Sequence, residues 1–193
     1  LMEIFYRDIS PEGMREVSGN RDYCNNWEGI RCENGQITEV RYYQIRHGNF
    51  NPFVLPHTVR ILMITNCAQT FEMDTRSLSR SSKVISFSVN EICGHCDLTT
   101  LPEKLEKARF WKNKMTGPIT LTHLPKTLKF LDISQNEIVQ ETVWYDNMPE
   151  RLKCVTLLKC DDEKRIKEVR AVRPENRIYV KGFFEGIKSV NVH

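Results

Sequence analysis

The tetrapeptide Cys93-Gly94-His95-Cys96 contains the residues of this chain whose spacing could do covalent chemistry. Two cysteines separated by two residues can cycle between dithiol and disulfide when the first thiol lies at a helix N-terminus, which lowers its pKa. Cysteine is also a Zn²⁺ ligand, and a zinc site would need two further ligands near Cys93 and Cys96. Cys67 or His123 could in principle approach from adjacent turns. The tetrapeptide therefore raises three hypotheses: a redox pair, a metal site or structural thiols.

The sequence offers no other catalytic motif. It contains no nucleophile elbow, no phosphate-binding loop and no H-E-x-x-H, and its carboxylates are scattered without a paired setting. We therefore predict that the protein is not an enzyme, has no catalytic residues and uses no cofactor. Which hypothesis applies to the tetrapeptide depends on the elements that position it.

A sequence repeat supplies those elements. Apolar residues followed by Asn or Cys recur in the order L-x-x-L-x-L-x-x-[N/C], and the last position of this pattern returns every 22 to 24 residues. Such a period indicates an array in which each unit buries its apolar face against its neighbours. The anchor positions are Ile45, Cys67, Asn90, Asn113, Asn136, Cys160 and Phe183.

Each repeat predicts a short strand. The two central apolar residues alternate, so both should point into the core. An anchor Asn can satisfy backbone groups of the neighbouring turn, and Cys there is a small buried group. In the same register Gly94 aligns with Gly117 and Cys96 replaces the inward Ile119. We therefore favour structural thiols for the tetrapeptide and predict no metal site.

The seven registers resemble the leucine-rich-repeat family across roughly residues 24 to 183. The stretch GPITLTHLPKTLKFLDISQNEI is closest to the LP-x-x-L repeats of plant receptor ectodomains and of protist repeat families. The resemblance implies an α/β repeat solenoid, a curved array of about seven turns with a parallel sheet on its concave face and an irregular convex side. The outer repeats lose Leu and Asn, so some turns should be irregular.

The segment DYCNNWEGIRCENGQITEV resembles the N-terminal cap of plant-type repeat proteins. That resemblance implies a disulfide between Cys24 and Cys32, with Trp27 covering the open end of the core. A cap is physically required because an open solenoid end exposes apolar surface and a strand edge. The preceding LMEIFYRDI reads as a short amphipathic helix that helps to cover this end. The same cap could also fold with reduced thiols.

Composition leaves the compartment open. The 193 residues are 40% apolar and 27% charged, with a net charge of +3, which is too small by itself to argue for nucleic acid. No apolar run is long enough to span a bilayer and no signal peptide is visible. The start at Leu1 suggests a processed protein or a fragment. If the cap disulfide forms we expect an extracellular or lumenal protein, and otherwise an organellar or cytoplasmic one within a complex.

The C-terminal region is less regular. DDEKRIKEVRAV, residues 161–172, reads as a helix with acidic residues in its first turn and a basic face. The resulting organisation is a cap over residues 1–36, repeats over 37–183 and a tail over 184–193.

The positions that flank the inward apolar pair should form rows on the concave sheet. These rows mix apolar and aromatic residues with Arg and Lys, a composition typical of protein-binding surfaces. The predicted partner-binding residues are Arg41, Tyr43, Ile61, Met63, Val84, Arg109, Trp111, Lys112, Phe130, Leu158 and Lys159. Two other interpretations stay open: a terminal segment could cover this face, or Tyr43 and Trp111 could stack on nucleic-acid bases.

We therefore predict a non-enzymatic protein-binding module that uses its concave face. The alternative is a structural accessory subunit of a large organellar or cytoskeletal assembly, because permanent interfaces are more hydrophobic than transient ones. In both cases the expected partners are proteins, with no nucleic acid and no transmembrane segment in this chain.

Overall fold

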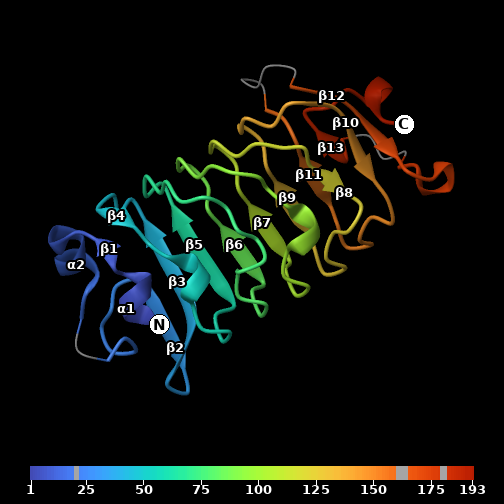
Figure 1. Ribbon diagram of the computed structural model, residues 1–193. Helices are drawn as coiled ribbons and strands as arrows, with labels where there is room; N and C mark the ends of the chain where they lie inside the picture. Colours follow the sequence, from blue (N-terminus) through green and yellow to red (C-terminus); the bar gives the residue numbers. More distant parts are fainter. Residues whose placement is uncertain (20–21, 160–164, 179–181) are drawn as a thin grey trace.

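Two layers of short strands wind into a solenoid in the computed structural model, which describes residues 1–19, 22–159, 165–178 and 182–193 (Figure 1). The class predicted from the repeat, a solenoid with a parallel sheet, is confirmed. Its helices are α1 Met2–Phe5 and α2 Pro11–Val17, with 3-10 turns η1 Pro52–Val54, η2 Leu98–Thr100, η3 Pro174–Asn176 and η4 Ser189–Asn191. Its strands are β1 Asp8–Ile9, β2 Ile30–Glu33, β3 Gln36–Tyr43, β4 Gly48–Asn49, β5 Ile61–Thr65, β6 Val84–Ser86, β7 Lys107–Arg109, β8 Thr120–Leu121, β9 Phe130–Asp132, β10 Gln140–Tyr145, β11 Cys154–Thr156, β12 Ile166–Ala171 and β13 Phe184–Glu185.

The main layer is an eight-stranded sheet in the order β13-β11-β9-β7-β6-β5-β3-β2. All neighbours are parallel except β2 and β3, which form an antiparallel hairpin at the N-terminal end. The back layer holds a three-stranded parallel sheet, β12-β10-β8, which the sequence did not predict. We call the outward face of the eight-stranded sheet the concave face.

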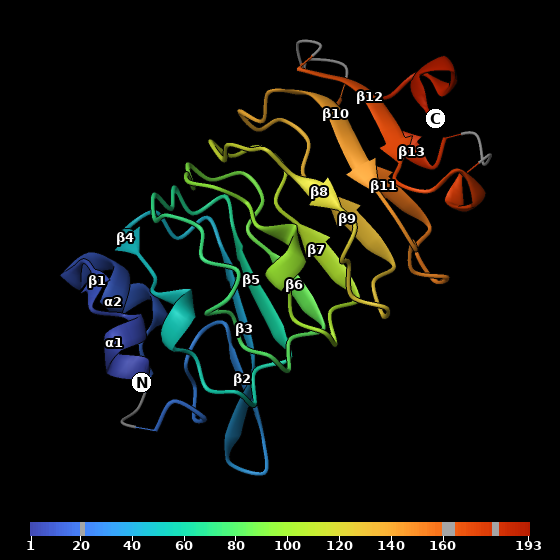
Figure 2. The same ribbon diagram turned by 45° about the vertical axis from the view of Figure 1, so that its right-hand side comes forward.

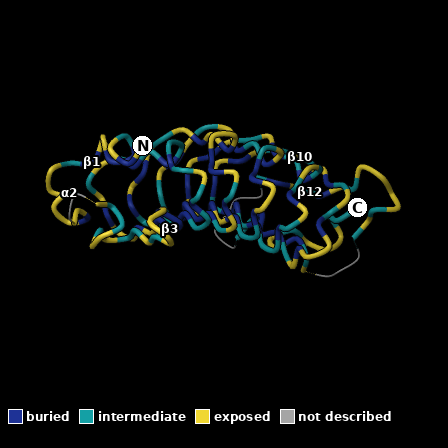
Figure 3. Tube along the Cα trace, turned by 90° about the horizontal axis from the view of Figure 1, so that it is seen from below, coloured by how far each residue is buried: buried dark blue, intermediate teal, exposed yellow. Residues whose placement is uncertain are grey.

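The core lies between the two layers along the whole solenoid, as the buried segments in Figure 3 show. Leu62, Ile85, Ala108 and Val155 point inward from neighbouring strands and have no exposed surface. These are the central apolar positions of the repeat. Burying a Leu or Ile side chain contributes about 1.5–3 kcal/mol, so the repeated pair is the main source of stability in each turn.

The anchor asparagines join consecutive turns by hydrogen bonds. The Asn113 side chain accepts from the Ile92 amide at 3.1 Å and donates to the carbonyls of Phe87 at 2.9 Å and Phe110 at 3.0 Å. Asn90 and Asn136 make the same contacts one repeat before and one repeat after. These bonds satisfy loop backbone groups that would otherwise be buried without partners.

Two glutamines extend this network where the asparagine pattern stops. Gln69, which is fully buried, donates to the carbonyls of Gly48 and Cys67 and accepts from the Phe50 amide at 2.8 Å. Gln140 accepts from the Ile119 amide at 2.6 Å and donates to the Ile119 carbonyl at 3.0 Å. The predicted ladder is therefore present and is longer than the Asn and Cys positions alone indicate.

The N-terminal cap closes one end of the core with aromatic rings. Cys24 and Cys32 form a disulfide, and the Trp27 ring lies 5.0 Å from the Tyr6 ring and 4.5 Å from the Tyr23 ring. The predicted N-terminal helix is shorter than expected: α1 ends at Phe5, and Asp8–Ile9 pair with β4 instead. Phe5 is nevertheless fully buried, so this segment does cover the end of the solenoid.

The predicted C-terminal helix is wrong for the residues that the structure describes. Ile166–Ala171 form β12, which runs parallel to β10 with Val143 opposite Val169. Residues 161–164, with the acidic first turn, lie outside the described residues. The unpaired backbone edge of β10 offers this segment hydrogen bonds that outweigh its helical pattern, as tertiary context often does.

The register predicted for the last repeat is also wrong. The seventh parallel strand is β13, with Phe184 opposite Val155. With Phe183 as its last anchor, the repeat pattern instead predicts Ile178 opposite Val155, and Val180 as the next inward residue. β12 and η3 lie between β11 and β13, so the last repeat is longer than the others. The final strand consequently falls within the segment predicted as a tail, and the predicted Val180 lies outside the described residues.

Replacing Asn113 by alanine should lower the free energy of unfolding by about 3 kcal/mol, because one buried amide and two buried carbonyls lose their partner. Urea denaturation measures this change. Asn191→Ala is the matched control, since Asn191 makes a single exposed bond to the Lys167 carbonyl at 3.0 Å. A cost for Asn113→Ala no larger than that of the control would mean that the ladder does not stabilise the array.

Alkaline pH should destabilise the cap through its buried tyrosines. The Tyr6 and Tyr42 hydroxyls lie 2.6 Å apart, and burial raises the pKa of both phenols well above the usual value. Because the folded-state pKa is the higher one, stability is fully present below pH ~10 and falls above it, by about 1.4 kcal/mol per pH unit for each tyrosine. The free energy of unfolding, measured by denaturation at increasing pH, should fall less steeply with pH in Tyr42→Phe than in the native protein. An unchanged slope would contradict this assignment.

Candidate functional site: the concave face

The concave face carries the predicted rows in the predicted register over β3 to β11. Arg41, Met63, Ser86, Arg109 and Asp132 are opposite one another on consecutive strands. Glu39, Ile61, Val84, Lys107, Phe130 and Cys154 form the adjacent row. At β13 the row of Arg41 and Arg109 ends with Glu185, which is opposite Thr156. The predicted register had put Arg177 and Tyr179, the neighbours of Ile178, at the end of the two rows, and Tyr179 lies outside the described residues.

The centre of this face, at β7 and the turn that follows it, combines cations with an aromatic ring. Lys107, Arg109, Trp111 and Lys112 all project here, and Arg109 and Lys112 are exposed. Among the described residues, no carboxylate forms an ion pair with Lys107, Arg109 or Lys112. β7 and the turn after it therefore present three cations that form no ion pair beside a tryptophan, although Asp132 is opposite Arg109 and Glu106 lies near Lys107.

Neighbouring strands hold the two aromatic rings in place. The Lys159 ammonium lies 4.2 Å from the centre of the Trp111 ring and 3.2 Å from the Asp132 carboxylate. Lys107 and Lys153 lie 5.8 Å and 5.5 Å from the centre of the Phe130 ring. Cation–π contacts of this kind contribute about 0.5–1 kcal/mol at exposed sites and fix the ring orientation. Trp111 and Phe130 are thus ordered before any partner binds.

The N-terminal half of the face is less charged. Ile61 and Val84 are opposite each other on β5 and β6, and Met63 lies two residues further along β5. All three are half-buried, with one face available to solvent. Arg41 bonds Glu39 at 2.8 Å and the Met63 sulfur at 3.0 Å, so its charge is already compensated.

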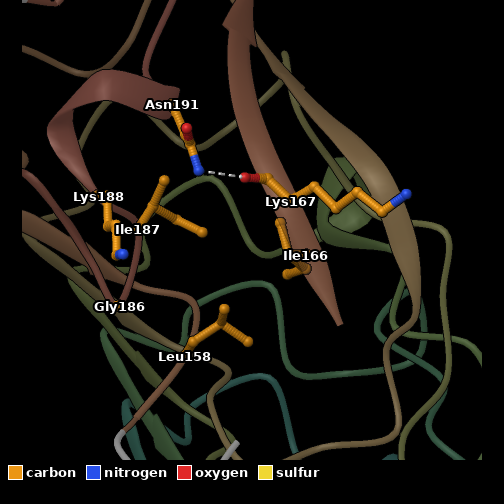
Figure 4. A pocket seen from close by; sticks show the side chains of 7 residues that line it. All are labelled: Leu158, Ile166, Lys167, Gly186, Ile187, Lys188 and Asn191. Atoms are coloured by element: carbon orange, nitrogen blue, oxygen red, sulfur yellow. Dashed lines mark hydrogen bonds between the residues drawn. The ribbon is translucent and has the colours of Figure 1, made fainter. Parts of the chain in front are cut away.

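Two further predicted residues have different surroundings. Tyr43 is 64% exposed at the end of β3, two residues after Arg41 and opposite Thr65 on β5. Leu158 lines a separate hollow of about 200 Å³ with Ile166, Ile187 and Asn191, between β12 and the segment after β13 (Figure 4). The role of the eleven residues in partner binding stays a prediction.

The rim of the concave face has a repeated backbone feature that sequence reasoning missed. Gln44, Asn66, Val89, Lys112 and Gln135, which each precede an anchor position, all have positive φ, between 53° and 63°. This left-handed conformation favours glycine or asparagine and is a genuine outlier for the β-branched Val89. Because glycine occupies none of these positions, its usual sequence signal was absent.

The Cys93 to Cys96 tetrapeptide is not arranged for thiol–disulfide exchange. It lies in a loop of the back layer, where Cys93 is exposed, Cys96 is fully buried and both thiols are free. Burial raises the pKa of Cys96 to about 12, so it stays a thiol at neutral pH. Over the described ranges no group of three or more His, Cys, Asp or Glu side chains is close enough to hold a metal ion.

Comparisons with known proteins yield likenesses only among solved structures. No protein-family model and no curated protein sequence matches the chain. Among solved structures, the crystal structure of a pollen receptor kinase 3 is similar, with a TM-score of 0.46 and 20% identity over 86% of this chain and 94% of that one. No helix in the described part of the chain has the length and apolar character needed to cross a membrane.

Thiol labelling should distinguish the cysteines by their position. Iodoacetamide should alkylate Cys93 in the native protein, Cys96 only after unfolding, and Cys24 and Cys32 only after reduction, since exposure and thiolate formation limit the reaction. Peptide mass mapping reads out each site. Equal native labelling of Cys93 and Cys96 would contradict the burial of Cys96, and native labelling of Cys24 and Cys32 would contradict the cap disulfide.

Proposed function

We propose that the protein is a non-enzymatic binding module whose concave face takes up an acidic polypeptide segment of a protein partner. The observation that carries the proposal is the cluster of Lys107, Arg109 and Lys112, none of which forms an ion pair in the described part of the chain, around the Trp111 ring that Lys159 contacts. Tryptophan and arginine are the residues most enriched in interaction hot spots, and they dominate affinity when their pockets exclude water.

The shape of the surface around Trp111 supports this role. In its row, Trp111 stands between Ser88 on the preceding strand and Ser134 on the next one, and both serines are buried. Their small side chains leave room beside the half-buried indole, where an apolar side chain of the partner would pack in the proposed complex. Carboxylates of the same segment would reach Arg109 and Lys112, and opposite charges also steer association.

The cap disulfide supports an oxidising compartment, because such bonds persist in secreted and lumenal proteins and are rare in the cytosol. We therefore propose that the partner is met outside the cell or in a lumenal space. The second hypothesis, a structural subunit of a large assembly, has no specific observation in its favour and stays a prediction.

Selection of linear peptides from a random display library tests the proposal. Peptides that bind the native protein should be enriched in Asp and Glu, and Trp111→Ala should weaken their binding at least about tenfold, a loss of roughly 1.4 kcal/mol. Titration of the selected peptides measures the dissociation constant, and thermal unfolding confirms that the variant folds.

Val139→Ala is the matched control for this experiment. Val139 is 69% exposed and directly precedes β10 in the back layer, so its truncation removes apolar surface away from the concave face. Peptides that respond to Val139→Ala and not to Trp111→Ala would place the binding surface on the back layer. A selected set with no acidic bias would remove the charge argument.

A further inference from the structure

The loops that enter the main sheet form a strongly basic edge. Residues 56–60, 79–83, 102–106, 125–129 and 149–153 precede β5, β6, β7, β9 and β11, and parallel strands bring all five loops to the same edge of the sheet (Figure 2). They contain eight Lys and Arg and three Glu residues, an excess of five positive charges. The whole chain has a net charge of +3, so the remainder is slightly acidic.

A hollow of about 350 Å³ lies at the N-terminal end of this basic edge. The tip of the β2–β3 hairpin forms one wall, and the first three loops form the other. Its lining residues are Glu33, Asn34, Gln36, Thr38, His57, Thr58, Arg60, Ser81, Lys83 and Lys104. None of them is aliphatic or a phenyl, phenol or indole group, so the hollow suits a hydrophilic ligand.

The charge of the hollow is only partly compensated. Arg60 forms an ion pair with Glu33 across the hollow. Lys83 and Lys104 are exposed, and the described part of the chain supplies neither side chain with an ion pair or a hydrogen bond. Two ammonium groups without an ion pair therefore line the same space as the side chains of Thr58, Ser81 and Asn34, although the Lys83 charge also helps to lower the pKa of the Glu106 carboxyl.

The cations continue beyond the hollow at a regular spacing. Arg60, Lys83, Lys129 and Lys153 occupy the same position in their repeats, immediately before the strand. Adjacent strands lie about 4.8 Å apart, so these charges extend over roughly 20 Å of edge. Glu106 interrupts the series, but the Lys129 ammonium bonds it and lowers the pKa of its carboxyl. A linear polyanion fits this geometry better than a single small anion.

We propose that the basic edge binds a sulfated polysaccharide, with one sulfate group placed in the hollow between Lys83 and Lys104. Nucleic acid fits less well, because single strands bind on exposed aromatic platforms and the only aromatic side chain of these loops is the His57 imidazole. An acidic protein fits less well because the hollow offers no apolar pocket for an anchor residue. The cap disulfide favours an extracellular or lumenal setting, and the proposal takes sulfated glycans as the polyanions met there.

Binding of a labelled heparin oligosaccharide of defined length to the full chain tests the proposal. The native protein should bind it at physiological salt and bind its desulfated form at least about tenfold more weakly, since ionic contacts supply most of the affinity. The Lys83→Glu, Lys104→Glu double variant should lose at least about tenfold in affinity. Its slope of log Kd against log salt concentration should fall by about two, one for each lost contact.

The control is Arg7→Glu combined with Lys188→Glu, which changes the net charge equally at two exposed positions away from this edge. This variant should bind within about twofold of the native protein, because the site and not the net charge controls affinity. An equal loss of affinity in both variants would overturn the proposal. It would also be overturned if the native protein bound heparin and its desulfated form with equal affinity. Polyglutamate or an oligonucleotide that binds as tightly as heparin, and loses that affinity in the Lys83→Glu, Lys104→Glu variant, would equally overturn it, whereas polyglutamate binding that the double variant keeps belongs to the concave face.

Discussion

Hydrogen bonding of the loop backbone between successive turns is the constraint on which this solenoid depends. Apolar burial holds the two layers together, but the loops between them bring peptide groups into the interior, where each unpaired group would cost about 1–3 kcal/mol. Asn90, Asn113 and Asn136 meet this requirement with a single amide that contacts the preceding turn. Each turn is therefore stabilised by its neighbours, and the strands are kept in one register from β3 to β11.

That register determines which side chains act together. Arg41, Arg109 and Asp132 are far apart in sequence but lie in one row, because each repeat places the same position in register with its neighbours across the parallel strands. The concave face and the basic edge both arise in this way. One comes from the outward strand positions and the other from the positions just before each strand, so variation at either set changes one surface without altering the core.

The repeat made the central part of the fold predictable from sequence. The spacing of Ile85, Ala108 and Leu131 fixed the strands, their inward face and the concave rows, and the anchor asparagines indicated the ladder. Prediction failed where tertiary contacts decide the structure: β12 replaced a helix, and β13 replaced the expected strand near Ile178. The glutamine contacts of Gln69 and Gln140 were missed because they lie off the anchor position.

Ser82 shows a further limit of pattern reasoning. It stands where the repeat usually has Leu, it is fully buried, and its hydroxyl is the one buried side-chain oxygen or nitrogen without a hydrogen-bond partner in the described residues. When the repeats of this chain are compared with one another, Ser82 reads only as a departure from the usual Leu. The structure shows an unsatisfied polar group, which opposes folding, so this turn relies on Ile85, Phe87 and the Asn90 contacts for its stability.

The small net charge of the whole chain conceals a local excess of positive charge on one edge of the sheet. The net charge of +3 alone gives little support for a polyanionic partner. In the solenoid, however, the loops before the strands collect an excess of positive charge, and β7 adds Lys107, Arg109 and Lys112 on the adjoining face. A partner senses the local potential within about a Debye length, roughly 8 Å at physiological ionic strength, and not the average over the chain. Parallel repeats therefore concentrate like charges along one edge while the whole molecule stays nearly neutral.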